Sequence, residues 1–220
     1  MNESTQKFKY ALQNLEAVFG VPENDCADDP LDELIGTILS QATTNANSHR
    51  AFANLKRRFP DWEQARKARA SSIEREIKCG GLAHQKSLRI KAILNQIYKQ
   101  RGNLDLSHLH TCPVDEAVAF LSQFNGVGPK TIGCVLLFAC KRPFFPMDVH
   151  IFRIAKRLGL IPANCSDDEA HKIMSKMIPK GKHYSAHINL IRLGRKICRP
   201  TNPKCDQCCL VEYCEYQNVM

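Results

Sequence analysis

Apolar residues recur at intervals of three and four along most of the chain, the spacing that places side chains on one face of an α-helix. Near the start, Phe8, Leu12, Leu15 and Phe19 follow this spacing. It recurs in five later segments, residues 28–41, 87–100, 113–124, 149–160 and 187–198. No segment alternates as a half-buried strand would. The pattern predicts an all-α protein with about nine or ten helices joined by short loops.

Two of these segments give specific expectations about which side chains are buried. In residues 87–100 the predicted apolar face contains Leu88, Ile90, Ile93, Leu94 and Ile97. In residues 187–198 it contains Ile188, Ile191 and Ile197.

Helix starts are marked by polar caps and prolines. Asp29 is a predicted N-cap with Pro30 at the first helical position. Ser166 and Glu169 have the spacing of a capping box. In contrast, residues 141–148 (KRPFFPMD) contain two prolines, which predicts an extended connection and the joint between two domains.

The excess of basic residues indicates which class of partner the protein binds. The 220 residues include 31 Lys and Arg against 22 Asp and Glu, a net charge of +9, which favours nucleic acid or an anionic membrane surface. The N-terminal segment has no apolar core of a secretory signal, and no apolar run is long enough to span a bilayer. We therefore expect a cytoplasmic protein without a membrane partner.

The eleven cysteines fall into two groups. Six occur singly and are predicted to be small buried hydrophobes: Cys26, Cys79, Cys112, Cys134, Cys140 and Cys165. The other five lie between Cys198 and Cys214, and in a reducing compartment such a cluster indicates metal ligands more than disulfides.

Four of the clustered cysteines have the spacing Cys-x6-Cys-x2-Cys-x5-Cys, at Cys198, Cys205, Cys208 and Cys214. The compact, unequal spacing suits a [4Fe–4S] cluster, and zinc is the alternative. Cys209 breaks the spacing and is left out of the ligand set. Four protein ligands leave no open position for a substrate, which favours a structural role.

The loop between the first two of these cysteines, RPTNPK, carries two cations. Arg199 and Lys204 are predicted either to bind phosphates or to be ordinary solvated charges.

The segment FNGVGPK, residues 124–130, reads as a tight turn between two helices. Gly126 and Gly128 would allow left-handed dihedrals and leave the backbone N–H groups bare, and Pro129 suits the first position of the next helix. Bare amides at such a helix start make a phosphate-sized anion site, although a simple connector has the same sequence pattern.

Lys130 stands at the wrong end of this helix for a cation, because the helix dipole favours anions there. The same dipole lowers the pKa of a lysine, and a neutral amine is a nucleophile that forms Schiff bases. The alternative is a surface lysine that reaches back to solvent.

Asp148 lies just before the predicted helix in residues 149–160. Its ordinary role is an N-cap, and its functional role is a carboxylate opposite a developing cation. The two roles are compatible, because a cap fixes the direction of the carboxylate.

Several stretches occur together in one order: LIGTILSQAT (34–43), GGLAHQKSLRIKAI (80–93), NGVGPKT (125–131), PMDVHIFRIAKRLGL (146–160), HINLIRLGRKIC (187–198) and the cysteine array ending in EYCEY (212–216). In these segments, over about residues 30–216, the chain resembles the endonuclease III family of helix-hairpin-helix DNA glycosylases. The resemblance implies a bilobal all-α fold with a DNA cleft between the lobes. Residues 1–29 would add an N-terminal helix to the iron–sulfur lobe, residues 30–142 would form a helical bundle with the hairpin, and residues 143–220 would form the C-terminal iron–sulfur lobe.

The resemblance also implies roles for individual residues. Lys130 matches the nucleophile, Asp148 matches the catalytic carboxylate, and the four cysteines match the ligands of a [4Fe–4S] cluster. Gln41 and Leu82 match residues that fill or wedge the gap left by an extruded base. The remaining implied DNA contacts are Gly126, Gly128, Thr131, His150, Arg199 and Lys204.

The implied activity is base excision: the amine of Lys130 displaces an oxidised pyrimidine from C1′, and β-elimination then breaks the strand at the abasic site. The expected partner is damaged duplex DNA, bound by a nucleoid-associated monomer. Two departures bear on geometry and lesion preference, namely Phe124-Asn125 where the family often has Leu-Pro, and Thr44 where known bacterial members have aspartate. Two alternatives stay open: a monofunctional glycosylase for mismatched or alkylated bases, and a non-catalytic DNA-binding protein or redox sensor.

Overall fold

The computed structural model describes residues 3–25 and 28–216, and within them every regular element is a helix. The predicted all-α class is confirmed. The α-helices are α1 Glu3–Phe19, α2 Pro30–Ser40, α3 Asn45–Arg58, α4 Trp62–Lys67, α5 Ala70–Ile77, α6 Ala83–Arg101, α7 Val114–Ser122, α8 Pro129–Cys134, α9 Val149–Arg157, α10 Asp167–Met177 and α11 His183–Lys196. Short turns of 3₁₀-helix are η1 Lys78–Gly80, η2 Ser107–His110, η4 Cys205–Gln207 and η5 Val211–Tyr213, and η3 Val135–Ala139 is a π-helix.

The described residues contain more α-helices than the sequence predicts, because α3 and α4 carry weak apolar patterns. In α3 only Ser48, Ala51 and Leu55 are buried, and α4 has six residues. Such helices are stable because of what they pack against, which their own sequence does not encode.

The chain divides into two compact units, one of residues 26–140 and one of residues 1–25 with 141–220. The segment 141–148 between α8–η3 and α9 contains no helix, as its prolines predict. Each unit has its own core.

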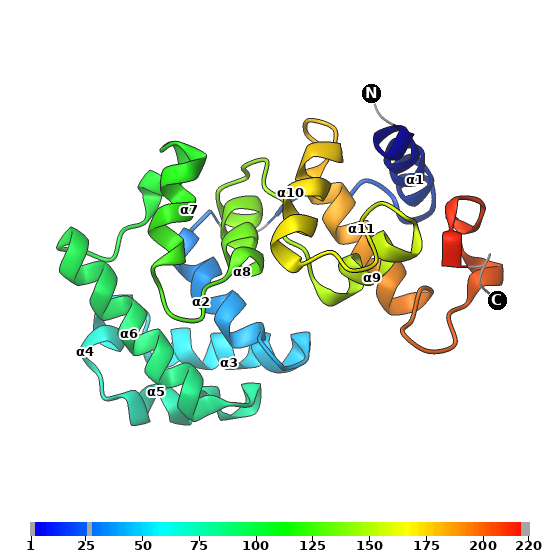
Figure 1. Ribbon diagram of the computed structural model, residues 1–220. Coiled ribbons are helices and arrows are strands. Elements are labelled where there is room, and N and C mark those ends of the chain that lie inside the picture. The colour runs from blue at the N-terminus through cyan, green and yellow to red at the C-terminus, as the bar shows by residue number, and fades with distance from the viewer. Residues whose placement is uncertain (1–2, 26–27, 217–220) are drawn as a thin grey trace. The chain divides into compact units, whose positions relative to one another are not determined.

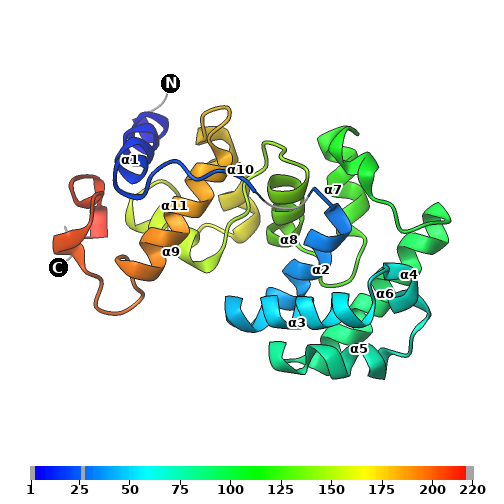
Figure 2. The same cartoon turned by 180° about the vertical axis from the view of Figure 1, so that it is seen from behind.

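In the unit of residues 26–140, α2 lies among α3, α6, α8 and η3 (Figures 1 and 2). Asp29 caps α2 as predicted, since its Oδ1 accepts hydrogen bonds from the backbone N–H groups of Leu31 and Asp32 at 2.8 and 3.1 Å. Seven of the eleven residues of α2 are buried, so this helix is the centre of the unit.

In the other unit, α1 from the N-terminal end packs against α10 and α11 from the C-terminal part (Figure 1). Three polar contacts hold the end of α1 in place. Lys182 Nζ donates to Glu16 at 2.8 Å, Asn189 Nδ2 donates to the Gly20 carbonyl at 2.8 Å, and Arg192 donates to the Phe19 carbonyl at 3.0 Å. Thus residues more than 160 positions apart share one core.

The two predicted apolar faces need correction. Leu88 is 49% exposed, because it lies outside the stripe that Ile90, Ile93, Leu94 and Ile97 form. In α11 the buried face contains Ala186, Leu190 and Leu193, while Ile188 and Ile191 are only half-buried. The helix has apolar residues on more than one side, so spacing alone does not select the buried side.

None of the helices in residues 3–25 and 28–216 has the length and hydropathy that crossing a membrane requires.

The packing of α1 gives a stability prediction. Phe8 is fully buried, so Phe8→Ala should lower the free energy of unfolding by about 3–5 kcal/mol. Val18 lies on the same helix but is 57% exposed, so Val18→Ala should change it by less than about 0.5 kcal/mol. Urea unfolding followed by circular dichroism measures both, and equal losses would contradict the packing described.

Candidate functional site

The hairpin between α7 and α8 presents Lys130 in the first turn of α8. Gly126 has φ of +79°, the left-handed conformation that favours glycine. Gly128 is the N-cap of α8 and is extended, with φ −98° and ψ −176°, so it does not use the left-handed region that a glycine allows. Pro129 occupies the first helical position as predicted.

Gln41, at the end of α2, is held against this hairpin. Its Nε2 donates to the Gly126 carbonyl at 3.3 Å, and its Oε1 accepts a hydrogen bond from Arg89 of α6 at 2.7 Å. A Cβ placed on Gly126 would lie 2.3 Å from Arg89 Nε, so the guanidinium packs directly on the turn. Sequence reasoning did not single out Arg89, although it lies in the family-like stretch of residues 80–93.

Leu82 precedes α6 and is 54% exposed, with a left-handed backbone at φ +49°. The side chain of Lys86, one turn later, is buried and donates to the carbonyls of Leu39 and Gly80 at 2.8 and 2.9 Å. Burial lowers the pKa of Lys86. Lys86 therefore joins the two loops that carry Gln41 and Leu82, a role that its position in the sequence does not reveal.

The side chain of Lys130 lines a pocket of this unit whose volume is about 370 Å³, toward the lower end of the range for ligand pockets. Its walls are formed by helices α2, α3 and α8 and by the π-helix η3. The other lining residues are Asp32, Glu33, Gly36, Thr37, Ser40, Asn45, Ser48, His49, Phe52, Cys134 and Phe138.

Burial shifts the pKa values of two acidic groups in this pocket. Burial raises the pKa of Glu33 to about 7, and a hydrogen bond from Thr37 and the charge of Lys130 oppose this increase. Burial raises the pKa of the Cys134 thiol to about 11, so this thiol is neutral at physiological pH. Sequence reasoning singled out neither residue for this site, since both read as ordinary helix positions.

Thr131 follows Lys130, and its side chain is 4% exposed. This burial restricts the side chain of Thr131, and the DNA contact expected at this residue stays a prediction. Its burial follows from the position of α8 against α2.

Asp148 and His150 belong to the unit that contains the termini. Asp148 is the N-cap of α9, as predicted, and its Oδ1 accepts from the backbone N–H groups of His150 and Ile151 at 2.9 and 2.8 Å. His150 is half-buried against Gly194, and its Nδ1 lies 3.1 Å from an Arg153 nitrogen. The cap therefore fixes the direction of the Asp148 carboxylate.

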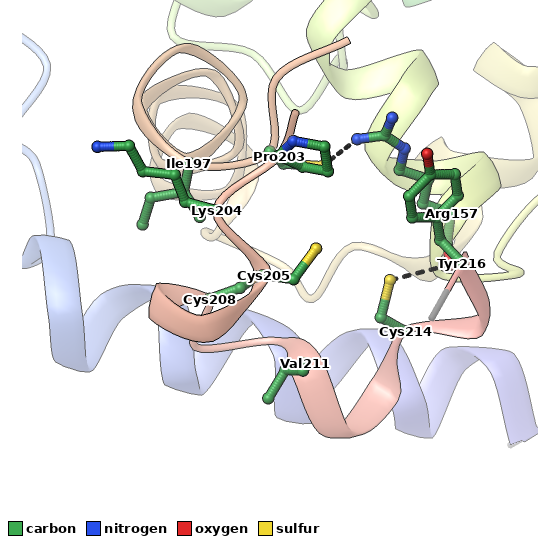
Figure 3. A pocket seen from close by; sticks show the side chains of 10 residues that line it. Arg157, Ile197, Pro203, Lys204, Cys205, Cys208, Val211, Cys214 and Tyr216 are labelled. Atoms are coloured by element: carbon green, nitrogen blue, oxygen red, sulfur yellow. Dashed lines mark hydrogen bonds between the residues drawn. The ribbon is translucent and has the colours of Figure 1, made fainter. Parts of the chain in front are cut away.

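Cys198, Cys205, Cys208 and Cys214 line one pocket together with apolar side chains (Figure 3). The sulfur atoms of Cys205 and Cys214 point into the same open space. Cys209 is not among the lining residues, in agreement with its omission from the predicted set. Within the described residues no three Cys, His, Asp or Glu side chains are close enough to hold a single metal ion.

Arg157 of α9 lies at the rim of this pocket. Its guanidinium donates to Cys198 Sγ at 3.2 Å and to the Arg199 carbonyl at 2.8 Å, and it packs over the ring of Tyr216 at 4.1 Å. Burial raises the pKa of Cys208 to about 11. A thiolate here needs positive charge nearby, and an iron–sulfur cluster supplies it when bound.

The remaining predicted residues of this region are on the surface. Arg199 and Lys204 are exposed on the loop between the first two cysteines. Among the single cysteines, Cys134, Cys140 and Cys165 are buried as predicted, Cys79 and Cys112 are half-buried, and Cys26 lies outside the described residues.

Comparison with known proteins places this geometry in a family. Residues 35–180 match the family described as HhH-GPD superfamily base excision DNA repair protein. The chain belongs to this superfamily. The endonuclease III resemblance predicted from the motifs is thereby confirmed, and the chain is a base excision DNA glycosylase of the helix-hairpin-helix class.

Two relatives illustrate the range of similarity. A candidate DNA glycosylase of Arabidopsis thaliana is 44% identical over 168 residues, which cover 76% of this chain and 57% of the plant protein. The chain thus spans little more than half of that relative. Endonuclease III of Thermotoga maritima is 30% identical over 201 residues, which cover 91% of this chain and 90% of that enzyme.

Two solved structures share the fold over nearly the whole chain. A non-covalent endonuclease III–DNA complex aligns with a TM-score of 0.83 at 25% identity, covering 98% of each chain. A thermostable thymine-DNA glycosylase aligns with the same TM-score at 21% identity, covering both chains completely, and at that identity it shows the fold alone.

The contact between the hairpin and Arg89 gives a second prediction. Gly126→Ala forces an alanine into left-handed backbone, at about 1–2 kcal/mol, and also displaces Arg89. Gly102→Ala is the matched control, since Gly102 has φ +74° and no atom within 4 Å of its added Cβ. We expect Gly126→Ala to lose more stability than Gly102→Ala by about 1–3 kcal/mol, as overpacking does. Equal losses in thermal unfolding would show that Arg89 does not fix the turn.

Proposed function

We propose that this glycosylase is bifunctional: it removes oxidised pyrimidines from duplex DNA and cleaves the strand at the resulting abasic site. The observation that carries the proposal is the amine of Lys130, which lines a ligand-sized pocket beside the hairpin. A lysine in such a position supplies the nucleophile that Schiff-base chemistry needs.

The reaction follows from the chemistry of an amine. Neutral Lys130 Nζ attacks C1′ of the damaged nucleotide, and the bond from C1′ to the base breaks. Opening of the sugar leaves a Schiff base between Nζ and C1′. This cation makes the 2′ proton acidic, so β-elimination breaks the C3′–O bond and cleaves the strand. The base must be out of the stack for this attack, as base chemistry in a duplex requires.

Asp148 is proposed as the carboxylate that stabilises positive charge on the sugar. Two backbone N–H groups hold one of its oxygens, which fixes the direction of the side chain. Capping and catalysis can therefore use the same carboxylate.

DNA binding is proposed to use the two loops that Lys86 joins. Gln41 and Leu82 are suited to the gap left by the extruded nucleotide, because one is polar and the other is an exposed apolar wedge. Gly126 and Gly128 of the hairpin, His150, Arg199 and Lys204 complete the proposed contacts, with phosphates as the ligands of the two cations. We propose that the protein acts as a monomer at the chromosome.

We propose that the four cysteines hold a [4Fe–4S] cluster. Their placement around one pocket supports this, because four thiolates at the corners of a cubane stand farther apart than the ligands of a single ion. When bound, the cluster supplies a structural centre for the C-terminal loop. Cys198 and Cys214 are held by Arg157, through its side chain and its carbonyl, at 3.2 and 3.4 Å.

A second candidate is a monofunctional glycosylase that releases mismatched or alkylated bases without cutting the strand. The shared fold with a thymine-DNA glycosylase makes it a useful comparison. The presence of Lys130 in the pocket favours the bifunctional reaction.

Borohydride trapping tests the proposed reaction directly. On a duplex with an abasic site, the wild-type protein should form a covalent adduct, because borohydride reduces the Schiff base. Lys130→Ala should form at least about 100-fold less, as expected for loss of a nucleophile. Lys99→Ala, which changes an exposed lysine of the same unit, is the control and should react like the wild type.

Two outcomes would contradict the proposal. An undiminished adduct with Lys130→Ala would assign the nucleophile elsewhere. Base release without any wild-type adduct, measured over duplexes with oxidised pyrimidines and with a G·T mismatch, would identify the monofunctional reaction.

The cluster is tested by metal analysis. The purified protein should contain about four iron atoms per chain and absorb visible light. Cys205→Ala should lose iron and absorbance, whereas Cys209→Ala should keep both, because Cys209 does not line the pocket. Stoichiometric zinc in place of iron would overturn the cluster assignment.

A further inference from the structure

We propose that Glu33 is the proton acceptor that makes the Lys130 amine neutral before it attacks the sugar. This inference rests on the proposed function, and it assigns the proton transfer within the pocket to a residue of α2.

The geometry brings an acid and a base from separate helices into one pocket. Glu33 lies in the first turn of α2, Lys130 lies in the first turn of α8, and these two helices pack against each other. Both side chains line the pocket, and each is half-buried. The positive charge of Lys130 acts on the Glu33 carboxyl. The pair therefore shares one pocket, in which partial burial reduces the screening of their charges by water.

Thr37 fixes the carboxyl of Glu33 from one side. Its Oγ1 donates to Glu33 Oε1 at 2.9 Å, one helical turn along α2, and Thr37 itself is 4% exposed. This bond occupies one carboxyl oxygen, and the second oxygen is the one proposed to take the proton.

The other titratable groups of the pocket do not fit this role. Asp32 accepts hydrogen bonds from Trp62 Nε1 at 2.6 Å and from Lys56 Nζ at 3.0 Å, which engage it in the packing of α3 and α4. The Cys134 thiol has a pKa near 11 and holds its proton at neutral pH. His49 lines the pocket from α3 but is exposed. Glu33 is thus the acid best suited to exchange a proton with Lys130.

The step balances in protons and electrons. The proton leaves the Lys130 ammonium for a Glu33 oxygen, and the electron pair stays on Nζ to form the bond to C1′. The carboxylic acid then returns a proton to the departing base, which leaves as an anion. A carboxyl whose pKa is about 7 suits both transfers, because catalytic acids and bases work best near the operating pH.

The sign of the pH dependence follows. Below about pH 7 Glu33 is protonated and cannot accept a proton, and above it the carboxylate can. The rate of Schiff-base formation should therefore rise with pH through about 7. Removing the Thr37 hydrogen bond, which lowers the pKa, should move this rise to higher pH.

The experiment is a pH profile of single-turnover borohydride trapping on abasic duplex DNA. Wild type should show the rise near pH 7. Glu33→Gln should lose this rise and react roughly 100-fold more slowly above it, as loss of a general base does. Thr37→Val should keep the rise but shift it upward, and Glu116→Gln, an exposed acid in α7, should leave the profile unchanged.

A direct titration separates this inference from the proposed function. Carbon-13 NMR of glutamate carboxyls in the intact protein, assigned by loss of a signal in Glu33→Gln, should show Glu33 titrating near 7. In Lys130→Met this pKa should rise further, because a positive charge is lost. Wild-type trapping with an unchanged profile in Glu33→Gln, or a Glu33 carboxyl that titrates at its ordinary value, would overturn the inference while the function stands. The absence of any wild-type adduct would instead overturn the proposed lyase reaction.

Discussion

A buried ammonium group determines how the loops that carry Gln41 and Leu82 are arranged. The side chain of Lys86 is 2% exposed, and a charge in that position is tolerated only when its hydrogen-bond donors are satisfied. The two acceptors are backbone carbonyls, of Leu39 at the end of α2 and of Gly80 before α6. Because these carbonyls precede Gln41 and Leu82 by two residues each, satisfying the charge also sets where those residues emerge. Arg89, one turn beyond Lys86, extends the same link through Gln41 to the hairpin that carries Lys130.

The free-energy cost of burying a charged group also affects the pocket at Lys130. Partial burial raises the cost of the ionised carboxyl at Glu33, and the nearby lysine lowers it again. A carboxyl whose pKa lies near the operating pH can exchange a proton with a neighbouring group more readily than an ordinary surface carboxylate. The pocket lined by α2 and α8 thus places the proposed nucleophile and its proposed proton acceptor together. In a fold that many glycosylases share, such residues are where one member can differ from another.

The unit of residues 1–25 and 141–220 includes a segment that needs stabilisation beyond its own apolar core. Its C-terminal segment is rich in loops and has few buried apolar residues of its own, with Leu210 the one fully buried among residues 198–216. Short segments with so few buried apolar residues need an additional stabilising interaction, such as a metal centre. Arg157 fits this need from the protein side, since it binds the first cysteine, the following backbone and the ring of Tyr216. The N-terminal helix α1 completes the core on which this segment rests.

The sequence by itself determined the local features of this protein. The helical class, the caps at Asp29, Asp148 and Ser166, and the cysteine spacing are all short-range, because each depends on residues within a few turns of one another. The family could be recognised for the same reason, since its motifs are contiguous. Helices with a weak apolar pattern, such as α3 and α4, were not predicted from the sequence. Gly128 adopts an extended conformation that any residue allows.

Only the tertiary structure decided which distant side chains meet. Nothing near Glu33 in the chain indicates Lys130, and the bond from Arg89 to Gln41 spans 48 positions. Such pairs form because separate helices bury their apolar faces against each other, and the polar groups carried along must then find partners in the space that remains. Packing of whole helices chooses those partners, which is why Lys130 could be singled out from the sequence as a candidate nucleophile, whereas the residues around it could not be predicted.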